Sequence, residues 1–169
     1  MSQFFPLIFV LLWSSAFITT LPIVLNSDPF SALAFRFFFV AVCFFIYSIV
    51  KKIKIKVNFS NLFNSFSTGI LFHGFYLGGV FYAIFVGLPT SIVALIVTLQ
   101  PILTNILAGY FLNEEVNIYQ WIGVVLGFTG AVMVIGFDIG STLPMKGLIA
   151  AVIALIAITT STIWQKKIS

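Results

Sequence analysis

Six long stretches of this sequence are almost free of charge, and each is long enough to cross a membrane as a helix. They run over residues 4–25, 30–50, 66–85, 91–112, 118–137 and 147–164. A helix needs roughly 20 apolar residues to cross a hydrocarbon core about 30 Å thick. Only 7% of the 169 residues are charged and 61% are apolar, whereas soluble domains carry roughly 25% charged residues. The sequence therefore predicts an all-α membrane protein, a polytopic bundle of six transmembrane helices, and excludes an ordinary soluble domain.

Lysines at the ends of these stretches predict the orientation of the chain. The connection after the second stretch holds four lysines and no acidic residue, and two more lysines follow the last stretch: Lys51, Lys52, Lys54, Lys56, Lys166 and Lys167. Connections rich in lysine and arginine face the cytoplasm. Alternation then predicts a multi-pass protein of the cytoplasmic membrane with both termini in the cytoplasm. The net charge of +4 reflects these membrane-flanking lysines, so the lipid bilayer is the expected partner and a nucleic acid is not.

Short connections and glycines predict close packing between helices. The connections at residues 86–90 and 113–117 are short enough to force neighbouring helices into antiparallel contact. Gly74 and Gly78 have GxxxG spacing in the third stretch, and Gly123 and Gly130 lie in the fifth. Small residues let helix backbones approach where lipid provides no hydrophobic driving force. We therefore interpret these four glycines as helix-packing positions rather than as part of a ligand site.

Arg36 is the charged residue that lies well within a predicted span, six residues into the second one. Insertion of a central arginine costs roughly 2.5–3.5 kcal/mol, so an intramembrane charge is a functional candidate by default. Outward snorkelling or structural pairing is an equally good interpretation at this depth. In the third span, His73 and Tyr76 are one turn apart and share a face. A hydrogen-bonded interhelical role is favoured for this lone histidine over a proton relay.

Polar residues also gather around a proline in the fourth span. Gln100 precedes Pro101, and Asn105 follows about one turn later. Proline removes a backbone hydrogen bond and bends the helix, which frees a carbonyl for water or a polar ligand. We interpret Pro101 as a helix kink that lines a cavity, although kinks also serve packing alone. In the first span, Trp13 and Ser14 lie on or beside an aromatic stripe that is more often packing than cavity lining.

These polar and aromatic residues at membrane depth are the candidates for lining a solute cavity: Trp13, Ser14, Arg36, His73, Tyr76, Gln100 and Asn105. Motifs of enzymes are not found, because the sequence has no HExxH, GxSxG, CxxC or glycine-rich phosphate loop. The four acidic residues lie near the predicted helix ends, so a carboxylate pair at membrane depth is not expected. The sequence predicts no enzyme, no metal site and no cofactor.

The order of these features resembles the first half of EamA-type members of the drug/metabolite transporter superfamily. Trp13-Ser14-Ser15-Ala16-Phe17 is similar to the family's Trp-Gly-Ser-x-Phe pattern, and Arg36-Phe37 stands at the place of its Arg-Phe pair. The similarity continues through residues 88–95 (LPTSIVAL), Pro101, Leu112-Asn113-Glu114, Gln120-Trp121-Ile122-Gly123 and Gly130-Ala131-Val132. Glu114 carries over as the loop glutamate of the family. Asn113 and Glu115 depart from a usual glycine and a common basic residue.

This resemblance implies both an architecture and a function. Full members of the family have ten helices in two inverted five-helix repeats. Residues 1–137 would form one such repeat, and residues 138–169 a sixth helix that begins a truncated second repeat. The implied function is alternating-access transport of small metabolites or drug-like solutes, and export is implied more often than import. Because such transporters pair two inverted repeats, this partial chain would need a second repeat or a homo- or hetero-oligomer. The alternative is a non-transporting assembly or accessory subunit whose polar residues only join helices.

Overall fold

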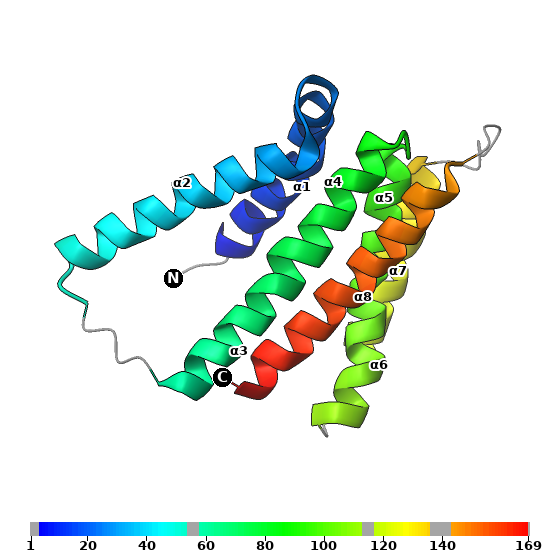
Figure 1. Cartoon of the computed structure of the whole chain (residues 1–169). Coiled ribbons are helices and arrows are strands. Elements are labelled where there is room, and N and C mark those ends of the chain that lie inside the picture. The colour runs from blue at the N-terminus through cyan, green and yellow to red at the C-terminus, as the bar shows by residue number, and fades with distance from the viewer. Residues whose placement is uncertain (1–3, 54–57, 113–116, 136–142, 169) are drawn as a thin grey trace.

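The structure, a computed structural model, describes residues 4–53, 58–112, 117–135 and 143–168. Its elements are α1 (Phe4–Asn26), α2 (Pro29–Val50), α3 (Phe59–Gly69), the π-helix η1 (Ile70–Leu77), α4 (Gly78–Phe85), α5 (Thr90–Val97), α6 (Gln100–Leu112), α7 (Ile118–Ile135) and α8 (Met145–Ile168). Because α3, η1 and α4 are continuous and α5 leads almost directly into α6, the described residues form six rods (Figure 1). Five are long and apolar enough to cross a membrane, and Ile118–Gly130 is a shorter apolar helix. The predicted all-α membrane bundle is confirmed.

The sixth rod, α8, lies in the middle of the bundle. It packs against η1 and α4 on one side and against α5 and α6 on the other (Figure 1). The buried face of α8 is made largely of small side chains, of which Ala151 and Ala154 are completely buried. Small side chains allow the close approach of neighbouring helices in a membrane. The predicted boundary between residues 137 and 138 lies outside the described residues, so the division into two domains stays a prediction.

The third rod begins earlier than the hydropathy pattern predicts. We expected a connection as far as Ser65, but α3 begins at Phe59. Asn58 caps this helix, because its side-chain oxygen accepts a hydrogen bond from the backbone N–H of Ser60 at 3.3 Å. The first turns of α3 contain serine and asparagine as well as phenylalanine, so this segment is too polar for a membrane window although it is helical. The expected start of the span was therefore wrong by two turns.

A tight turn joins α4 to α5 and ends the third rod sharply. Gly87 has a backbone φ of 92°, a left-handed conformation that glycine adopts without steric cost. The N–H of Leu88 donates to the carbonyl of Ala83 and the N–H of Gly87 to that of Ile84, both at 3.0 Å. These two bonds form a Schellman cap, and Leu88 is almost completely buried beneath it. The short predicted connection is therefore a capped helix end that returns the chain directly along the bundle.

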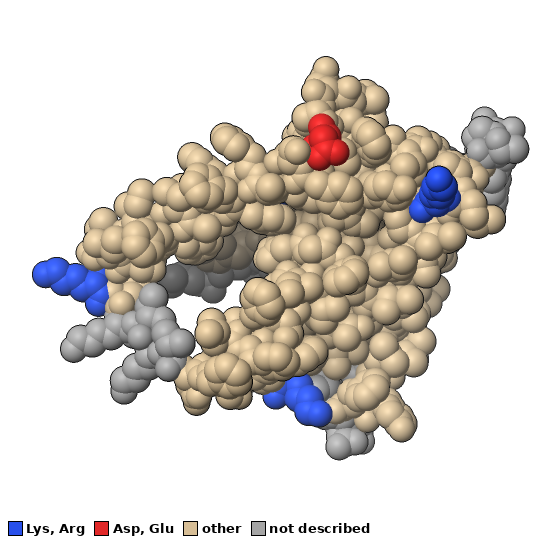
Figure 2. All heavy atoms as spheres, in the orientation of Figure 1, with Lys and Arg blue, Asp and Glu red and all other residues tan. Residues whose placement is uncertain are grey.

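Charged side chains lie at opposite edges of the bundle. Figure 2 shows blue side chains at the left end and at the lower edge, a red side chain near the top, and a further blue side chain at the upper right. In Figure 1, α2 ends at the left and α8 ends at the lower edge, and these ends carry Lys51 and the pair Lys166 and Lys167. The upper edge includes the turn between α1 and α2, which contains Asp28. Lys146, at the start of α8, lies at this upper edge as well. Among the described residues, lysines are therefore more numerous at the ends of α2 and α8 than at the edge that holds Asp28, as the positive-inside rule describes for one face of a membrane protein.

Asp28 caps α2, and its titration should be visible in the stability of the bundle. The Ser31 N–H donates to a carboxylate oxygen of Asp28 at 2.8 Å and lowers the pKa of that carboxyl below its usual value of 3.8. The capping contribution is therefore complete above that usual value and is lost as the pH falls through the lowered native value. We expect Asp28→Ala to lower the thermal unfolding midpoint at neutral pH. Asp28→Asn caps the helix without titrating. Its midpoint at neutral pH should therefore equal that of the unsubstituted protein, and the midpoint should fall less as the pH is lowered. Equal acid dependence in Asp28→Asn and the unsubstituted protein would contradict this role.

Candidate functional site

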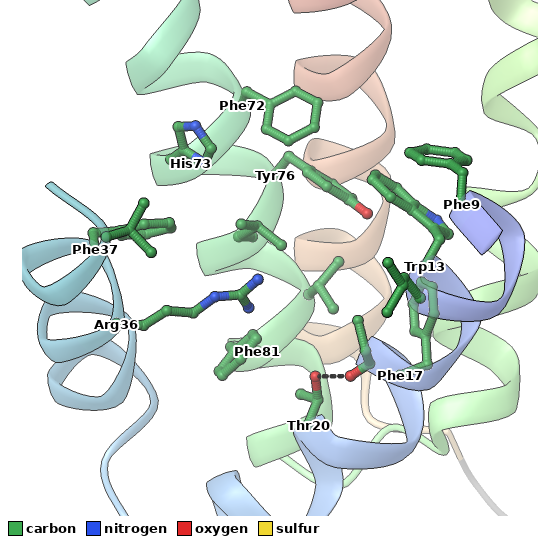
Figure 3. A pocket seen from close by; sticks show the side chains of 15 residues that line it. Phe9, Trp13, Phe17, Thr20, Arg36, Phe37, Phe72, His73, Tyr76 and Phe81 are labelled. Carbon is green, nitrogen blue, oxygen red and sulfur yellow. Dashed lines mark hydrogen bonds between the residues drawn. The ribbon is translucent and has the colours of Figure 1, made fainter. Parts of the chain in front are cut away.

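A pocket of about 360 Å³ lies between the α1–α2 hairpin and the third rod (Figure 3). Its walls come from α1, α2, η1 and α4. Aromatic and aliphatic side chains dominate the lining, which consists of Phe9, Leu12, Trp13, Ala16, Phe17, Thr20, Arg36, Phe37, Val40, Phe72, His73, Tyr76, Leu77, Val80 and Phe81. A mostly apolar cavity with a few polar groups is the usual composition of a small-molecule site.

Four of the seven cavity candidates from the sequence meet in this pocket, although they lie on three different elements: Trp13, Arg36, His73 and Tyr76. Tyr76 lies nine residues before the end of α4, which is about 14 Å at 1.5 Å per residue. This places Tyr76 near the middle of a hydrocarbon core about 30 Å thick. The pocket therefore reaches the depth at which a solute site in a membrane transporter is expected.

Trp13 and Tyr76 join α1 to the third rod across the pocket. Their rings are nearly parallel, with an interplanar angle of 7° and centroids 6.4 Å apart. Phe9 extends this wall by one turn of α1, with its ring centroid 5.5 Å from that of Trp13. Phe72 meets Tyr76 edge-on at 5.3 Å. Aromatic pairs at these separations stabilise a contact beyond the apolar area that they bury, so these rings hold α1 against the third rod.

His73 lies between two phenylalanine rings, toward the α2 side of the pocket (Figure 3). The Phe37 and Phe72 rings lie edge-on to the imidazole, with centroids at 4.9 Å and 5.1 Å. We expected an interhelical hydrogen bond for His73. Among the described residues this side chain makes ring contacts instead, because the groups around it are aromatic.

Arg36 reaches into the pocket from α2, opposite the Trp13 and Tyr76 wall (Figure 3). It lies seven residues after Pro29, the first residue of α2, or about 10 Å along the helix axis. The acidic residue that the structure describes, Asp28, is engaged with the backbone of Ser31. Within the described part of the chain, no carboxylate therefore forms an ion pair with Arg36. A guanidinium inside a membrane without such a partner is costly, and a bound anion would offset part of this cost.

The π-helix η1 supplies four pocket residues and was not predicted. Phe72, His73, Tyr76 and Leu77 all lie within Ile70–Leu77. Short π-helical segments are rare and are found frequently at functional sites. The hydropathy period does not separate a π-helix from an α-helix over such a short length, so the sequence carried no usable signal for it. The other side of η1 packs on α8, which couples the pocket wall to the centre of the bundle.

Three cavity candidates lie outside this pocket. Ser14 is exposed on α1 and is absent from the lining. The Gln100 amide donates to the hydroxyls of Thr104 at 3.3 Å and Thr162 at 3.5 Å, and so joins α6 to α8. Asn105 lines a separate groove of about 550 Å³ between α6 and α7. Polar character at membrane depth identified these residues, but it does not determine which side of a helix meets the pocket.

Pro101 lies in the first turn of α6, directly after an interruption of the fourth rod. α5 ends at Val97 and α6 begins at Gln100, so the break occurs at Thr98 and Leu99. Proline has no N–H to donate to the carbonyl of Val97, which removes one bond of the helix ladder. Pro101 lines the same groove between α6 and α7 as Asn105, not the aromatic pocket.

The predicted packing glycines do not make the close contacts of the bundle. A Cβ atom on Gly78 would lie 3.7 Å from Cε1 of Phe30, and one on Gly74 would meet only Ile70 of its own helix at 3.9 Å. Near Gly123 and Gly130 no described atom would lie within 4 Å of such a Cβ. These two α7 positions correct our expectation, because Gly123 borders the open groove beside α6 and helix backbones do not touch there. Close contacts are made instead by Gly79, whose Cβ would lie 2.8 Å from the carbonyl oxygen of Ala150, and by Gly147, whose Cβ would lie 2.9 Å from Cβ of Leu88.

Most aromatic lining residues were not among the predicted cavity candidates. The stripe with Trp13 on the first span also contains Phe17, and such a stripe is more often packing than cavity lining. Phe9 extends it by one turn, and Phe37 follows Arg36 directly. Phe72 and Phe81 had no distinguishing signal in a chain with 21 phenylalanines. In the described residues, no three His, Cys, Asp or Glu side chains cluster to form a metal site. Glu114, the predicted loop glutamate, lies outside the described residues.

The comparison with known proteins agrees with this architecture. Residues 2–136 match the EamA-like transporter family. The chain belongs to this family. The match contains α1 to α7 and therefore every residue of the pocket. Membership makes this EamA-like chain an integral membrane protein of a family described as transporters.

One curated relative and the solved structures complete the comparison. The EamA-like chain is 27% identical over 97 residues to a Bacillus subtilis (strain 168) protein named "Uncharacterized transporter YvbV". The aligned region is 57% of this chain and 30% of the relative, so the alignment reaches less than a third of that protein's length. No solved structure matches the chain significantly. The name of that relative calls it a transporter and identifies no solute.

Proposed function

We propose that this EamA-like chain contributes the solute-binding pocket of a secondary transporter for small metabolites or drug-like solutes that works by alternating access. The observation that supports this most directly is Arg36, an intramembrane cation without a described carboxylate partner, in an aromatic pocket. A structural arginine in a membrane is normally paired. A pocket at this depth with a fixed charge and aromatic walls is suited to a transient solute rather than to permanent packing.

The membrane, the orientation and the missing partner belong to the same proposal. Lysines at the ends of α2 and α8 support a cytoplasmic location for both termini, in a cytoplasmic (inner or plasma) membrane. Family resemblance supports export as the direction. Solute sites of inverted-repeat transporters lie between two repeats, and the chain aligns with only 30% of its relative. We therefore infer that a second repeat, or another copy or subunit, completes the transport path.

Solute flux through reconstituted protein tests this function. The intact gene product is placed in proteoliposomes, and efflux or uptake is measured for a panel of small metabolites. We expect at least one solute to move, and Arg36→Gln to reduce its flux at least tenfold, because the pocket would lose its fixed charge.

Lys146→Gln is the matched control for this experiment. It also removes a cation, but Lys146 lies at the start of α8 beside a different groove, so flux should be retained. Absence of flux for every solute in the panel, with protein that is folded and correctly inserted, would count against transport.

An assembly or accessory subunit is the second candidate function, and one feature supports it. Ser161 on α8 is completely buried and donates to the backbone carbonyl of Thr68 on α3 at 3.1 Å. The bond from Gln100 on α6 to Thr162 on α8 likewise joins two helices, and none of these four residues lines the pocket. A subunit of this kind should purify in a stable hetero-complex and show no solute flux, whereas the transporter should show flux.

A further inference from the structure

The charge balance of the pocket indicates which class of solute it takes. Arg36 supplies a permanent positive charge to the lining, whereas no aspartate or glutamate lines the pocket within the described residues. The remaining polar groups are the His73 imidazole, the Tyr76 and Thr20 hydroxyls and the indole N–H of Trp13. The hydroxyl of Thr20 already donates to the carbonyl of Ala16 at 2.7 Å. The Thr20 oxygen can still accept, and the His73 and Tyr76 groups can each donate or accept, whereas the guanidinium and the indole N–H can only donate. Donors therefore outnumber acceptors in the lining, which favours a solute whose hydrogen-bond acceptor carries a negative charge.

The apolar walls restrict the rest of the solute. Aromatic rings from three elements surround the space opposite the guanidinium (Figure 3). The volume of about 360 Å³ is near the lower end of the range of small-molecule pockets, about 300–1,000 Å³. This size and this lining suit a compact apolar or single-ring body. A solute with several charges would leave all but one of them without a partner in an apolar cavity, which is costly.

A cationic solute is the competing interpretation of an aromatic pocket. Aromatic cages bind ammonium groups through the faces of their rings. Here the Arg36 guanidinium shares the same lining, and a second positive charge close to it in a low-dielectric space is repelled. An ammonium group would also find no carboxylate among the described lining residues. The presence of Arg36 therefore favours an anion over a cation.

We propose that the pocket binds a monocarboxylate with a compact apolar or aromatic body and no ammonium group, with its carboxylate on Arg36 and its body against Trp13 and Tyr76. This inference rests on the proposed function, because it names the solute class of the same pocket. Arg36 is suited to this role because its planar guanidinium forms two parallel hydrogen bonds to a carboxylate. Bound in this way, the carboxylate offsets the cost of an intramembrane arginine.

Tryptophan fluorescence tests the proposal directly. The chain has three tryptophans, so Trp121→Phe with Trp164→Phe leaves Trp13 as the reporter within the pocket. The full chain in lipid nanodiscs is titrated with 3-phenylpropanoate, with its amide, and with phenylalanine, which adds an ammonium group to the same ring and carboxylate. We expect a saturable change with 3-phenylpropanoate, and binding at least tenfold weaker for the amide and for phenylalanine.

Variants of Arg36 connect this preference to the proposed contact. Arg36→Gln should reduce the binding of 3-phenylpropanoate to that of the amide, whereas Lys146→Gln should leave the preference intact. Arg36→Lys retains a point charge without the planar fork and should retain part of the preference. Size-exclusion profiles and helical circular dichroism establish that each variant is folded. If Arg36→Gln does not fold, the Arg36→Lys variant and the comparison of solutes with unsubstituted Arg36 still decide the result.

The outcomes separate this inference from the proposed function. Saturable binding of the amide or of phenylalanine as tight as that of 3-phenylpropanoate would overturn the monocarboxylate proposal and leave a solute pocket for transport. Binding of 3-phenylpropanoate that survives Arg36→Gln unchanged would overturn the role of Arg36. If none of the three solutes changes Trp13 fluorescence in a saturable way but flux of another solute is observed, the monocarboxylate proposal fails and the proposed transport function is retained. If neither a fluorescence change nor flux of any solute is observed, both proposals fail.

Discussion

Gly79→Leu is expected to lower the thermal unfolding midpoint of the bundle by about 5–10 °C, because it separates α4 from α8. An added Cβ at this position would lie 2.8 Å from the carbonyl oxygen of Ala150 and 3.0 Å from Cβ of Ala154. Both neighbours belong to a helix that is packed on several sides, so neither yields cheaply. Overpacking of this kind typically costs about 1–3 kcal/mol, and a leucine adds three further carbons. For a chain of this size, each 1 kcal/mol shifts the midpoint by about 2–4 °C.

Gly78 offers a matched control on the adjacent position. Its Cβ would lie 3.7 Å from an edge carbon of Phe30, which is ordinary van der Waals contact. Gly78→Ala gains roughly 1 kcal/mol of helix propensity and should leave the midpoint equal or higher. Gly79→Ala gains the same propensity but meets the backbone of α8, so it should lower the midpoint. Equal midpoints for the two alanine variants, measured in the same detergent, would show that the contact between α4 and α8 is not tight.

The glycine pattern illustrates what the sequence determines and what it leaves open. GxxxG spacing indicates a helix with small residues on one side, and Gly74, Gly78 and Gly79 all border one groove between the third rod and α8. The closest contact falls on Gly79, one residue outside the motif, because the angle at which α8 crosses decides which residue is nearest. That angle depends on side chains some 70 residues away in sequence, beyond the reach of any local pattern.

The same reasoning explains which part of the pocket was predictable. Hydropathy and loop length determine the helices, because a lipid solvent requires long uncharged segments with their backbone hydrogen bonds satisfied internally. Membrane depth then identified Arg36, His73 and Tyr76, which are unusual in such segments. Gln100 is equally unusual, yet its amide bonds to Thr162 on α8. Whether a buried amide serves a solute or a neighbouring helix depends on what faces it, and that is a property of the assembled bundle.

Tyr76→Ala is expected to have the largest effect on both the fold and the pocket. Tyr76 is only 2% exposed, and its ring lies parallel to that of Trp13 and edge-on to that of Phe72. Truncation of a buried aromatic side chain costs about 3–5 kcal/mol. We expect the unfolding midpoint to fall by about 10 °C or more. Trp13 fluorescence should change even without solute, because the indole loses its neighbour, and the response to 3-phenylpropanoate should be lost.

Tyr76→Phe separates the ring from its hydroxyl. In the described part of the chain, the hydroxyl of Tyr76 has no hydrogen-bond partner, so its removal should change the unfolding free energy by less than about 1 kcal/mol. The stack on Trp13 is retained, and the solute-free fluorescence of Trp13 should be unchanged. Any loss of solute binding in Tyr76→Phe then measures a hydrogen bond from this hydroxyl to the solute. If Tyr76→Ala instead keeps both the midpoint and the Trp13 response, the stacked wall contributes neither to the fold nor to the site, and the solute must bind elsewhere in the bundle.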